Sequence, residues 1–426
     1  MLDMKMFREF VDILRADHDK REMPYDDIED VIRLDEEWRR TRYDVDQLRK
    51  KRNEAARGIA QAKKSGDKMA ADTILSEVAT LGSEIDALTE KADSCLIERD
   101  KIRMRVPNVM HESVPIGEDD QKNTLHSLHG EKSNFDFDPK THNDLIELNG
   151  WVDLPRGAKV TGSRFYFLQG DLARLDMALQ NYSANFLIER GYRLVQPPLM
   201  MNRDAYEGVT DLADFETVMY GIEPDKYYLI ATSEHPLTAM RMDEIIEPSE
   251  LPIKMVGVSP CFRREVGAHG LSDRGIWRVH QFTKIEQIII CKPEDSWGHH
   301  EELLENATSL WDSLGLHYRV VNICTGDMGT VAAKKYDLEA WLPGAGSYKE
   351  VVSCSNCTDY QANRLRMRYR TSEGNETVHT LNSTAVATSR ALVAIIEQNQ
   401  NEDGSVTIPD VLIPFMNGQS KLKSVN

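Results

Sequence analysis

Charged residues set into an apolar pattern between residues 255 and 286 are the strongest sign of chemistry in this sequence. Arg263 and Glu265 end one apolar run, and a second run returns through Phe282 to Glu286 after a polar, glycine-containing loop. This pattern predicts two antiparallel strands joined by a long loop. Because a charge on a core strand is costly without a partner, a ligand with negative and hydrogen-bonding groups would explain it. A salt-bridged amphipathic hairpin is the alternative interpretation.

A T-x-E triplet, Thr232-Ser233-Glu234, lies before Pro236. Such a triplet is common by chance. Its simplest interpretation is the start of a helix, with Thr232 as the cap and a carboxylate in the first turn.

Cys354 and Cys357 form a C-x-x-C pair within the segment 348–361, which suggests half a zinc site or a redox pair. A structural zinc site needs two further nitrogen or sulfur ligands. No second C-x-x-C or H-x₃₋₅-H follows in the sequence, so we expect no zinc.

Small residues from Leu381 to Ser389 precede a strongly apolar segment that continues through ALVAII, with Arg390 at its start. Close packing of a helix on a sheet would explain the small residues.

Two long helices are predicted before these segments. Apolar or small residues recur at steps of three and four from Val31 to Ala62, and the pattern resumes from Ile74 to Ile102 after a break at 64–68. Such spacing over several heptads predicts helices, and so short a break makes them an antiparallel coiled-coil hairpin. At about 1.5 Å per residue, an arm of about 36 residues would reach about 50 Å.

The hairpin carries the one clearly basic island of an acidic chain. Residues 39–68 contain eleven Lys or Arg and four Asp or Glu, although the net charge of the chain is −18. A charged coiled coil is usually a solvated face, but a merely solvated hairpin would mix its charges. The excess of cations favours contact with nucleic-acid phosphates.

Length and composition indicate a globular protein of two or three domains. The chain has 426 residues, of which 41% are hydrophobic and 29% charged. The charged N-terminus is no signal peptide, and no apolar stretch approaches the roughly 18 residues of a membrane span. Six scattered cysteines fit a reducing cytoplasm. Neither a G-x-G-x-x-G motif after a strand nor a P-loop occurs.

These segments together resemble class II aminoacyl-tRNA synthetases, and most closely the seryl-tRNA synthetases. Residues 261–286 resemble motif 2, 186–209 resemble motif 1, and 381–390 resemble motif 3. The triplet at 232–234 and the segment 348–361 match stretches of the seryl enzymes. In motif 3, small residues replace glycines found in many bacterial members, which brings the match closer to the archaeal and eukaryotic branch: Ser383, Ala385, Ala387 and Ser389. His235 and the motif 2 loop residues Leu271, Ser272 and Asp273 depart from the usual pattern, so their roles stay open.

The resemblance implies an α+β fold, with an antiparallel-sheet catalytic domain flanked by helices (116–426) behind a coiled-coil tRNA-binding arm (1–115). It implies a cytoplasmic homodimer, paired through motif 1, that activates L-serine with ATP and Mg²⁺ and transfers serine to the 3′ end of tRNA(Ser). Whether a selenocysteine tRNA is also a partner stays open. A class II paralogue that does not charge tRNA and a non-enzymatic coiled-coil RNA-binding or scaffold protein remain the alternatives.

The resemblance also assigns residues to sites. Arg263 and Arg390 are the expected catalytic residues, with Arg263 bridging the serine carboxylate and the α-phosphate. The expected ATP-binding residues are Arg263, Arg264, Glu265, Arg278, Phe282, Glu350, Val351, Val352, Ser353 and Arg390, of which Glu350 and Ser353 would also hold Mg²⁺. The expected serine-binding residues are Thr232, Ser233, Glu234, Arg263, Glu286 and Thr384. The expected tRNA-binding residues are Arg39, Arg42, Arg49, Lys50, Arg52, Arg57, Lys63 and Lys64.

Overall fold

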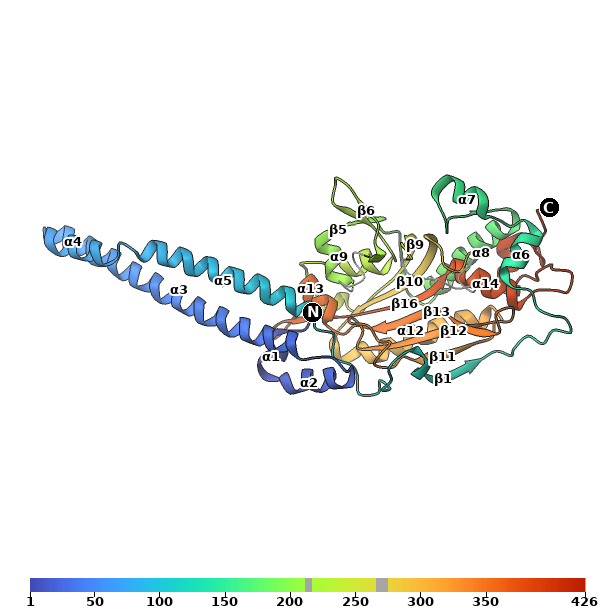
Figure 1. Ribbon diagram of the computed structural model, residues 1–426, viewed down its shortest axis with the longest axis horizontal. Helices are drawn as coiled ribbons and strands as arrows, with labels where there is room; N and C mark the ends of the chain where they lie inside the picture. The colour runs from blue at the N-terminus through green and yellow to red at the C-terminus, as the bar shows by residue number, and fades with distance from the viewer. Residues whose placement is uncertain (211–216, 266–274, 426) are drawn as a thin grey trace. The chain divides into compact units, whose positions relative to one another are not determined.

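The computed structural model describes residues 1–210, 217–265 and 275–425, and the chain forms two compact units (Figure 1). The helical unit comprises Leu2–Pro107. The second unit comprises Met1 and Asn108–Asn426; it contains most of the predicted catalytic domain and is named the catalytic unit after that prediction. None of the helices in the described ranges is both long and apolar enough to cross a membrane.

The helical unit is built on the predicted antiparallel hairpin, which is confirmed. Its two long helices share a seam of buried side chains that includes Val31, Val45, Ile85 and Ala92. The first long helix ends at Gly66, whose φ of 81° is the left-handed conformation that a helix C-cap requires. The helices are α1 (Met4–Glu9), α2 (Val11–Lys20), α3 (Asp26–Ser65), α4 (Lys68–Glu77) and α5 (Leu81–Arg103).

The second half of the hairpin differs from the single helix that the spacing predicts. It is broken between Glu77 and Leu81, so that α4 and α5 are separate. The break contains β-branched Val78 and Thr80, which lose side-chain freedom in a helix and so form helices less readily. The three-four spacing of apolar residues continues across the break, and it could not reveal the interruption.

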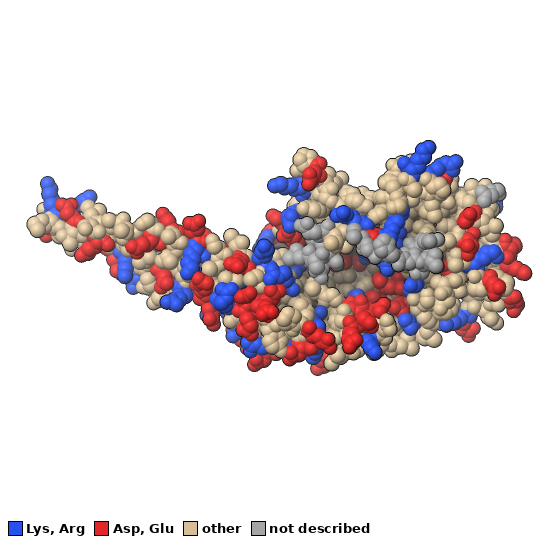
Figure 2. Space-filling model, viewed as in Figure 1, with Lys and Arg blue, Asp and Glu red and all other residues tan. Residues whose placement is uncertain are grey.

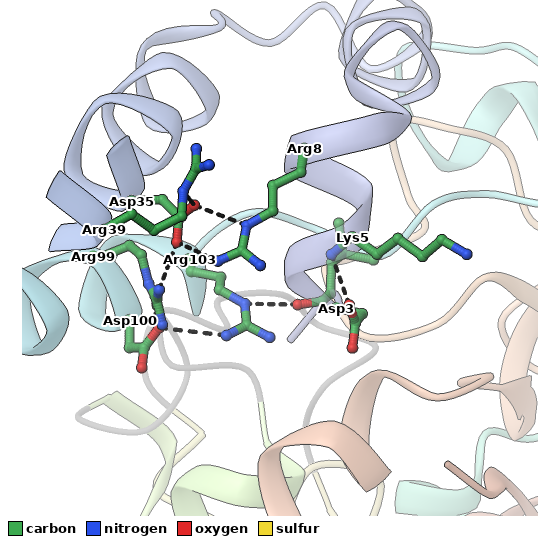
Figure 3. Close-up of polar contacts among 9 residues, drawn as sticks. Asp3, Lys5, Arg8, Asp35, Arg39, Arg99, Asp100 and Arg103 are labelled. Carbon is green, nitrogen blue, oxygen red and sulfur yellow. Dashed lines mark hydrogen bonds and ion pairs between the residues drawn. The ribbon is translucent and has the colours of Figure 1, made fainter. Parts of the chain in front are cut away.

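A buried carboxylate ties three helices of this unit together (Figure 3). Asp35 on α3 accepts hydrogen bonds from two nitrogens of Arg8 on α1, each at 2.8 Å, and from Arg39 Nε at 3.0 Å. Arg99 on α5 donates to the same carboxylate at 2.8 Å and pairs with Asp100 through its other nitrogens. This Asp35 cluster links α1, α3 and α5.

The catalytic unit contains an eight-stranded sheet among the described residues. Its neighbouring strands are antiparallel except for the parallel pair β4 and β9. The strands, in their order across the sheet, are β1 (Thr124–His129), β11 (Tyr318–Asn322), β12 (Lys334–Leu342), β13 (Ser347–Asn356), β16 (His379–Ala387), β10 (Gln281–Cys291), β9 (Ile253–Phe262) and β4 (Arg193–Val195).

Helices and short strands surround this sheet (Figure 1). The helices are α6 (His142–Asn149), α7 (Leu154–Thr161), α8 (Gly170–Ile188), α9 (Arg203–Val209), α11 (Glu234–Ala239), α12 (Ser296–Ser313), α13 (Tyr360–Leu365) and α14 (Thr388–Gln398). The short strands are β2 (Val152–Asp153), β3 (Phe167–Leu168), β5 (Met200–Asn202), β6 (Gly221–Ile222), β7 (Tyr227–Leu229), β8 (Ile245–Ile246), β14 (Arg368–Thr371) and β15 (Gly374–Thr377).

The two faces of β10 pack into different hydrophobic clusters. Ile289 belongs to the larger cluster, which includes Leu310 of α12 and Ile395 of α14. Ile288 and Ile290 belong to a second cluster with residues of α9, α11 and α13. Because side chains alternate along a strand, the even-numbered residues of β10 face α9, α11 and α13. This face carries the candidate site.

Candidate active site

Alternation along β10 aligns the polar residues of the candidate site. Phe282, Lys284 and Glu286 are spaced by two residues, so their side chains project from the same face of the sheet. The antiparallel strands β9 and β10 form the predicted motif 2 hairpin. Arg263 lies one residue beyond the end of β9 rather than on the strand, and the loop residues Leu271, Ser272 and Asp273 lie outside the described ranges.

Two β-bulges align residues that regular strands would separate. Glu350 and Ser353 are three residues apart, so in a regular strand they would face opposite sides of the sheet. In the β12–β13 pairing Leu338 opposes Val352 and Glu339 opposes Glu350, which leaves Val351 as an extra residue on β13. Such a bulge redirects the following side chains, and both Glu350 and Ser353 face the cavities.

The neighbouring strand β16 has a second bulge. Lys284 and Ile285 of β10 oppose Ala387 and Val386, but Glu286 opposes Thr384, so Ala385 is extra. Thr384 and Ala387 consequently both line one cavity, although they are three residues apart. The bulges thus gather side chains from β13 and β16 on the same side as Lys284.

Two adjoining cavities open on this face, with empty volumes of about 510 Å³ and about 1360 Å³. The smaller cavity is lined by groups that could hold a nucleotide, including Glu265, Phe282 and Arg390. The larger includes Thr232 and Glu234. The two cavities share a wall formed by Arg263, Lys284, Glu350, Ser353 and Thr384.

Arginines from three segments surround the smaller cavity. Arg263 Nε donates to the carbonyl of Ala231 at 3.2 Å, and its guanidinium lies 5.4 Å from the centroid of the Phe282 ring. Arg278 Nη1 lies 3.5 Å from a Glu265 carboxylate oxygen. Cations placed around a cavity with an aromatic wall suit a ligand that carries phosphates and a flat base.

Arg390, near the start of α14, contacts the bulged part of β13. Its Nη1 donates to the backbone carbonyl of Glu350 at 2.8 Å and lies 3.4 Å from the Glu350 carboxylate. The guanidinium also lies 5.4 Å from the centroid of the Trp277 ring. Arg390 is therefore fixed at the mouth of the smaller cavity beside Glu350.

The wall between the cavities contains a buried ion pair that the sequence analysis did not anticipate. Lys284 Nζ lies 2.6 Å from Glu286 Oε2 and donates to Thr232 Oγ1 at 3.1 Å. Lys284 is 8% exposed, and Glu286 is fully buried behind it. The Phe282-x-Lys284-x-Glu286 alternation was the signal that could have revealed Lys284.

Glu234 is held by amides in the wall of the larger cavity. Its Oε1 accepts hydrogen bonds from Gln361 Nε2 at 3.2 Å and from Asn382 Nδ2 at 3.1 Å. Burial, together with the nearby charge of Glu286, raises the pKa of Glu234 to about 7. Such a carboxylate gains from a bound cation, and the ammonium group of an amino acid is one.

Thr232 and Ser233 precede α11 as the sequence predicts, and the cap is Thr232 in effect. Its Oγ1 accepts a hydrogen bond from the backbone N–H of Glu234 at 3.2 Å, whereas the Ser233 side chain makes no cap bond. Ser233 is buried, and its hydroxyl donates to the carbonyl of Gly257 at 3.5 Å.

His235 lies in the wall of the larger cavity. Its ring packs edge-on against Tyr206 at a centroid distance of 4.9 Å. Burial lowers the pKa of His235 to about 3, so this histidine is neutral at physiological pH. Its aromatic packing fits a structural role.

The two cysteines of the C-x-x-C pair are separate, buried free thiols. Burial raises the pKa of both. Cys354 Sγ contacts the carbonyl of His300 at 3.8 Å, and Cys357 Sγ accepts from Asn382 Nδ2 at 3.7 Å. Within the described ranges, no group of three or more His, Cys, Asp or Glu side chains is arranged to hold a metal.

The structure brings most of the predicted site residues together, but five of them lie outside the cavity walls. Glu286 and Ser233 lie behind the wall of the larger cavity, and Val352 lies in the core. Arg264 and Arg278 flank the smaller cavity without lining it. The other predicted ATP-binding and serine-binding residues line one cavity or both.

The residues predicted to bind tRNA lie on α3. Arg39 pairs with Asp35 at 3.0 Å and Arg49 lies 3.9 Å from Asp46. Lys and Arg side chains alternate with Asp and Glu along the visible face of the helical unit (Figure 2). The remaining predicted cations have no ion pair among the described residues: Arg42, Lys50, Arg52, Arg57, Lys63 and Lys64.

Comparison with known families identifies both units. Residues 218–399 match the tRNA synthetase class II core domain (G, H, P, S and T), and residues 1–110 match the seryl-tRNA synthetase N-terminal domain. The antiparallel sheet and the paired cavities, together with the core-domain match, define a class II aminoacyl-tRNA synthetase.

Similarity to individual proteins extends over almost the whole chain. The serine–tRNA ligase of Methanocella arvoryzae is 52% identical, with 98% of this chain and 99% of the relative covered. The crystal structure of seryl-tRNA synthetase from Pyrococcus horikoshii complexed with ATP matches with a TM-score of 0.94 at 42% identity, covering 100% of both chains. The Naegleria fowleri cytoplasmic serine–tRNA ligase in complex with AMP matches with a TM-score of 0.89 at 35% identity, covering 100% of this chain and 99% of that one. The chain belongs to the seryl-tRNA synthetase family, so the predicted family, fold class and enzyme class are confirmed.

Proposed function

We propose that this chain is a serine–tRNA ligase. It activates L-serine with ATP to give seryl-adenylate and pyrophosphate, and then transfers serine to the terminal adenosine of tRNA(Ser) with release of AMP. The observation that carries the proposal is the wall shared by two cavities, because a nucleotide and an amino acid in adjoining cavities meet at Arg263.

The activation step needs alignment and positive charge rather than a protein nucleophile. One oxygen of the serine carboxylate attacks the α-phosphorus while pyrophosphate leaves, and the negative charge grows on the phosphate oxygens. Arg263 contacts the serine carboxylate and the α-phosphate with its guanidinium fork. Arg390 and Arg278 hold the outer phosphates, Glu265 accepts from the adenine amino group, and Phe282 stacks on the base.

The larger cavity holds the amino acid. Glu234 provides the counter-ion for its ammonium group, and Thr232 contacts its backbone groups. The serine hydroxyl is recognised by Glu286 and Thr384. In the transfer step, the hydroxyl of the terminal adenosine attacks the serine carbonyl and AMP leaves.

The oxygen atoms of Glu350 and Ser353 fit a magnesium ion. Both face the shared wall because of the β13 bulge, and carboxylate and hydroxyl oxygens suit a hard cation. Two protein ligands are few, and the other ligands would be phosphate oxygens and water, as is usual for Mg²⁺ with nucleotides. Bound there, the ion would neutralise phosphate charge.

Three features of the cellular context belong to the same proposal. The cations of α3 bind the tRNA backbone. The M. kandleri seryl-tRNA synthetase, solved in complex with a selenocysteine tRNA, shares the fold at 18% sequence identity to this chain. A homodimer forms through motif 1, where apolar side chains that include Ile188, Leu194, Leu199 and Met200 are exposed. The setting is the cytoplasm, where translation occurs.

Serine-dependent exchange of pyrophosphate into ATP tests the proposal directly. Purified protein should catalyse the exchange with serine and at most weakly with the other amino acids, and should then charge tRNA(Ser). Exchange without charging would indicate a paralogue that does not serve tRNA. The absence of exchange with every amino acid would reject the enzymatic function.

A further inference from the structure

Lys284 occupies the junction of the two cavities but has no role in the scheme above. Its ammonium group lies 2.6 Å from Glu286 and 3.1 Å from the hydroxyl oxygen of Thr232. Both neighbours are proposed to contact serine. A lysine that is 8% exposed between two such groups determines what each can offer to a ligand.

The hydrogen bonds of Thr232 fix the role of its hydroxyl. A hydroxyl has one proton to donate and two lone pairs to accept. Thr232 Oγ1 accepts from Lys284 Nζ at 3.1 Å and from the backbone N–H of Glu234 at 3.2 Å. Since both lone pairs are used, the hydroxyl can only donate to a ligand.

Glu286 depends on Lys284 for its charge. The carboxylate is fully buried, and neither oxygen accepts a hydrogen bond of ordinary geometry from the residues that the structure describes. Burial raises the pKa of Glu286, while Lys284 and the Thr384 hydroxyl lower it. Without the ammonium group, such a carboxylate would take up a proton and could become a donor.

The charges around Glu286 complement a zwitterion. When Glu234 and Glu286 are both ionised, Lys284 balances one of the two carboxylates, and the other is left for the substrate ammonium. Arg263 supplies the cation for the substrate carboxylate. The titratable groups that face Glu286 are Lys284 on its own strand, Glu234 of α11, Arg263 and Cys261 at the end of β9, and Cys354 of β13, and burial keeps both thiols protonated.

We infer that Lys284 sets the hydrogen-bond polarity of the amino-acid pocket, holding Glu286 as the acceptor for the serine hydroxyl and Thr232 as a donor to the serine carboxylate. The inference rests on the proposed function. Glu286 Oε1 lacks a hydrogen-bond partner in the described part of the chain, and a serine hydroxyl lying against Thr384 supplies the missing donor. Lys284 is a positioning residue that acts through Glu286 and Thr232.

Lys284→Met tests this role, because methionine keeps much of the volume and removes the charge. The kcat/KM of serine-dependent pyrophosphate exchange should fall about 100-fold at pH 7, as expected when a buried charge-assisted interaction is lost. The serine-over-alanine ratio should fall at least about tenfold, since alanine has no hydroxyl for Glu286 to accept. The acid limb of the serine profile should move to higher pH by at least about one unit, because Glu286 loses its neighbouring cation.

Two variants control for folding and for general charge loss. Lys254→Met removes a lysine–glutamate pair between β9 of the same sheet and α12, in which Lys254 Nζ lies 2.8 Å from Glu302, and Lys254 lines neither cavity. It should leave the pH profile and the ratio unchanged. Lys284→Arg retains the charge and should keep the acid limb near its wild-type position even where its altered shape slows the reaction.

A double variant shows whether Lys284 acts through Glu286. In a Glu286→Gln background, adding Lys284→Met should change the serine-over-alanine ratio less than about threefold, because the two residues form one unit. A full, additive fall in the ratio would overturn the inference, and so would an unshifted acid limb in Lys284→Met. If the wild-type protein itself shows no serine-dependent exchange, the proposed function fails instead. If Lys284→Met misfolds, Lys284→Arg and Glu286→Gln decide. The acid limb of Glu286→Gln should lie at lower pH than that of the wild type, because Glu234 then loses the neighbouring charge that raises its pKa.

Discussion

One nitrogen of Arg263 is fixed by a hydrogen bond to the backbone. Nε donates to the Ala231 carbonyl, and Arg263 lines both cavities, so its guanidinium is anchored in their shared wall. This arrangement is preorganised for a charge that develops in the transition state. Arg263→Ala should lower the rate of adenylate formation by about 10²–10³, equivalent to about 3–4 kcal/mol. The rate of serine-dependent pyrophosphate exchange measures this loss.

The fold and tRNA binding of Arg263→Ala should match the wild type, which hydrogen exchange and a filter-binding assay check. Arg319→Ala serves as the matched control, because Arg319 on β11 pairs with Glu339 away from both cavities. A rate for Arg263→Ala within threefold of wild type would remove Arg263 from the mechanism.

Thr384 is proposed to recognise the serine hydroxyl together with Glu286. A purely steric pocket distinguishes serine from alanine by only about 10–200-fold, whereas a site with polar groups that need the hydroxyl can reach about 10⁴. Thr384→Val keeps the shape and removes the hydroxyl. The serine-over-alanine ratio of kcat/KM should therefore fall about tenfold or more, corresponding to a lost buried hydrogen bond of about 1.5 kcal/mol. Equal slowing of serine and alanine would reduce Thr384 to a structural residue.

At the scale of elements, the Asp35 cluster is the connection between α1, α3 and α5. Removing the carboxylate leaves Arg8, Arg39 and Arg99 together without their shared counter-ion. Asp35→Asn should therefore destabilise the helical unit by about 3 kcal/mol, the lower end for a broken buried pair, because Arg8 and Arg39 keep contact with water. Hydrogen exchange of the α1 and α5 amides in the full-length chain measures the loss.

Asp30→Asn provides the control, because the Asp30–Arg33 pair on α3 is exposed. An exposed pair of this kind contributes about 0–1 kcal/mol, so the exchange rates should hardly change. Equal effects of the two variants would show that the Asp35 cluster contributes no more than a surface pair.

The same cluster predicts how the helical unit responds to acid. Burial alone would raise the pKa of Asp35, but the ion pairs with Arg8 and Arg99 outweigh it and hold the pKa below its ordinary value of 3.8. A lowered pKa in the folded state means that the stabilisation is complete above about pH 3.8 and is lost as the pH falls through the folded-state value. Below that pH, the protection of the α1 amides, measured against the intrinsic exchange rate at each pH, should fall. In Asp35→Asn the protection should lack this dependence on pH.

At the scale of the whole molecule, the two units should divide the work. Deleting residues 45–87 and joining the ends with a short glycine linker retains the Asp35 cluster and removes most of the predicted tRNA-binding cations. Serine-dependent pyrophosphate exchange should remain within about twofold, since the cavities lie in the catalytic unit. Charging of tRNA should collapse, and the remaining tRNA affinity should depend much less on salt, because fewer phosphate contacts release counter-ions.

A variant that changes only the charges tests whether tRNA binding depends on the cations of α3 or on the shape of the arm. Glutamine at Arg49, Lys50, Arg52, Arg57, Lys63 and Lys64 keeps helical propensity and removes six charges. The slope of log affinity against log salt should fall by up to about five, at roughly 0.9 per phosphate contact. Undiminished charging by the deletion variant would show that tRNA binds elsewhere.

The sequence determined much of this protein because local patterns carried the information. Three-four spacing predicted the helical hairpin, and alternating strands around Arg263 and Glu286 predicted the central hairpin of the sheet. The family motifs located Thr232, Glu350 and Arg390 from the sequence alone. Side chains at these positions can be assigned from neighbours in the chain, because each motif is one continuous stretch of sequence.

Only the tertiary structure decided which of these side chains face one another. The bulge at Val351 reverses the side-chain alternation of β13, and no residue type announces a bulge, because its position depends on the register with β12. The role of Lys284 also depends on the tertiary structure, since its contact with Thr232 joins the segment before α11 to β10, where it pairs with Glu286. Sequence determines the residues and the period of each element, whereas the direction of a side chain at a bulge and its charge partner depend on strands far away in the chain.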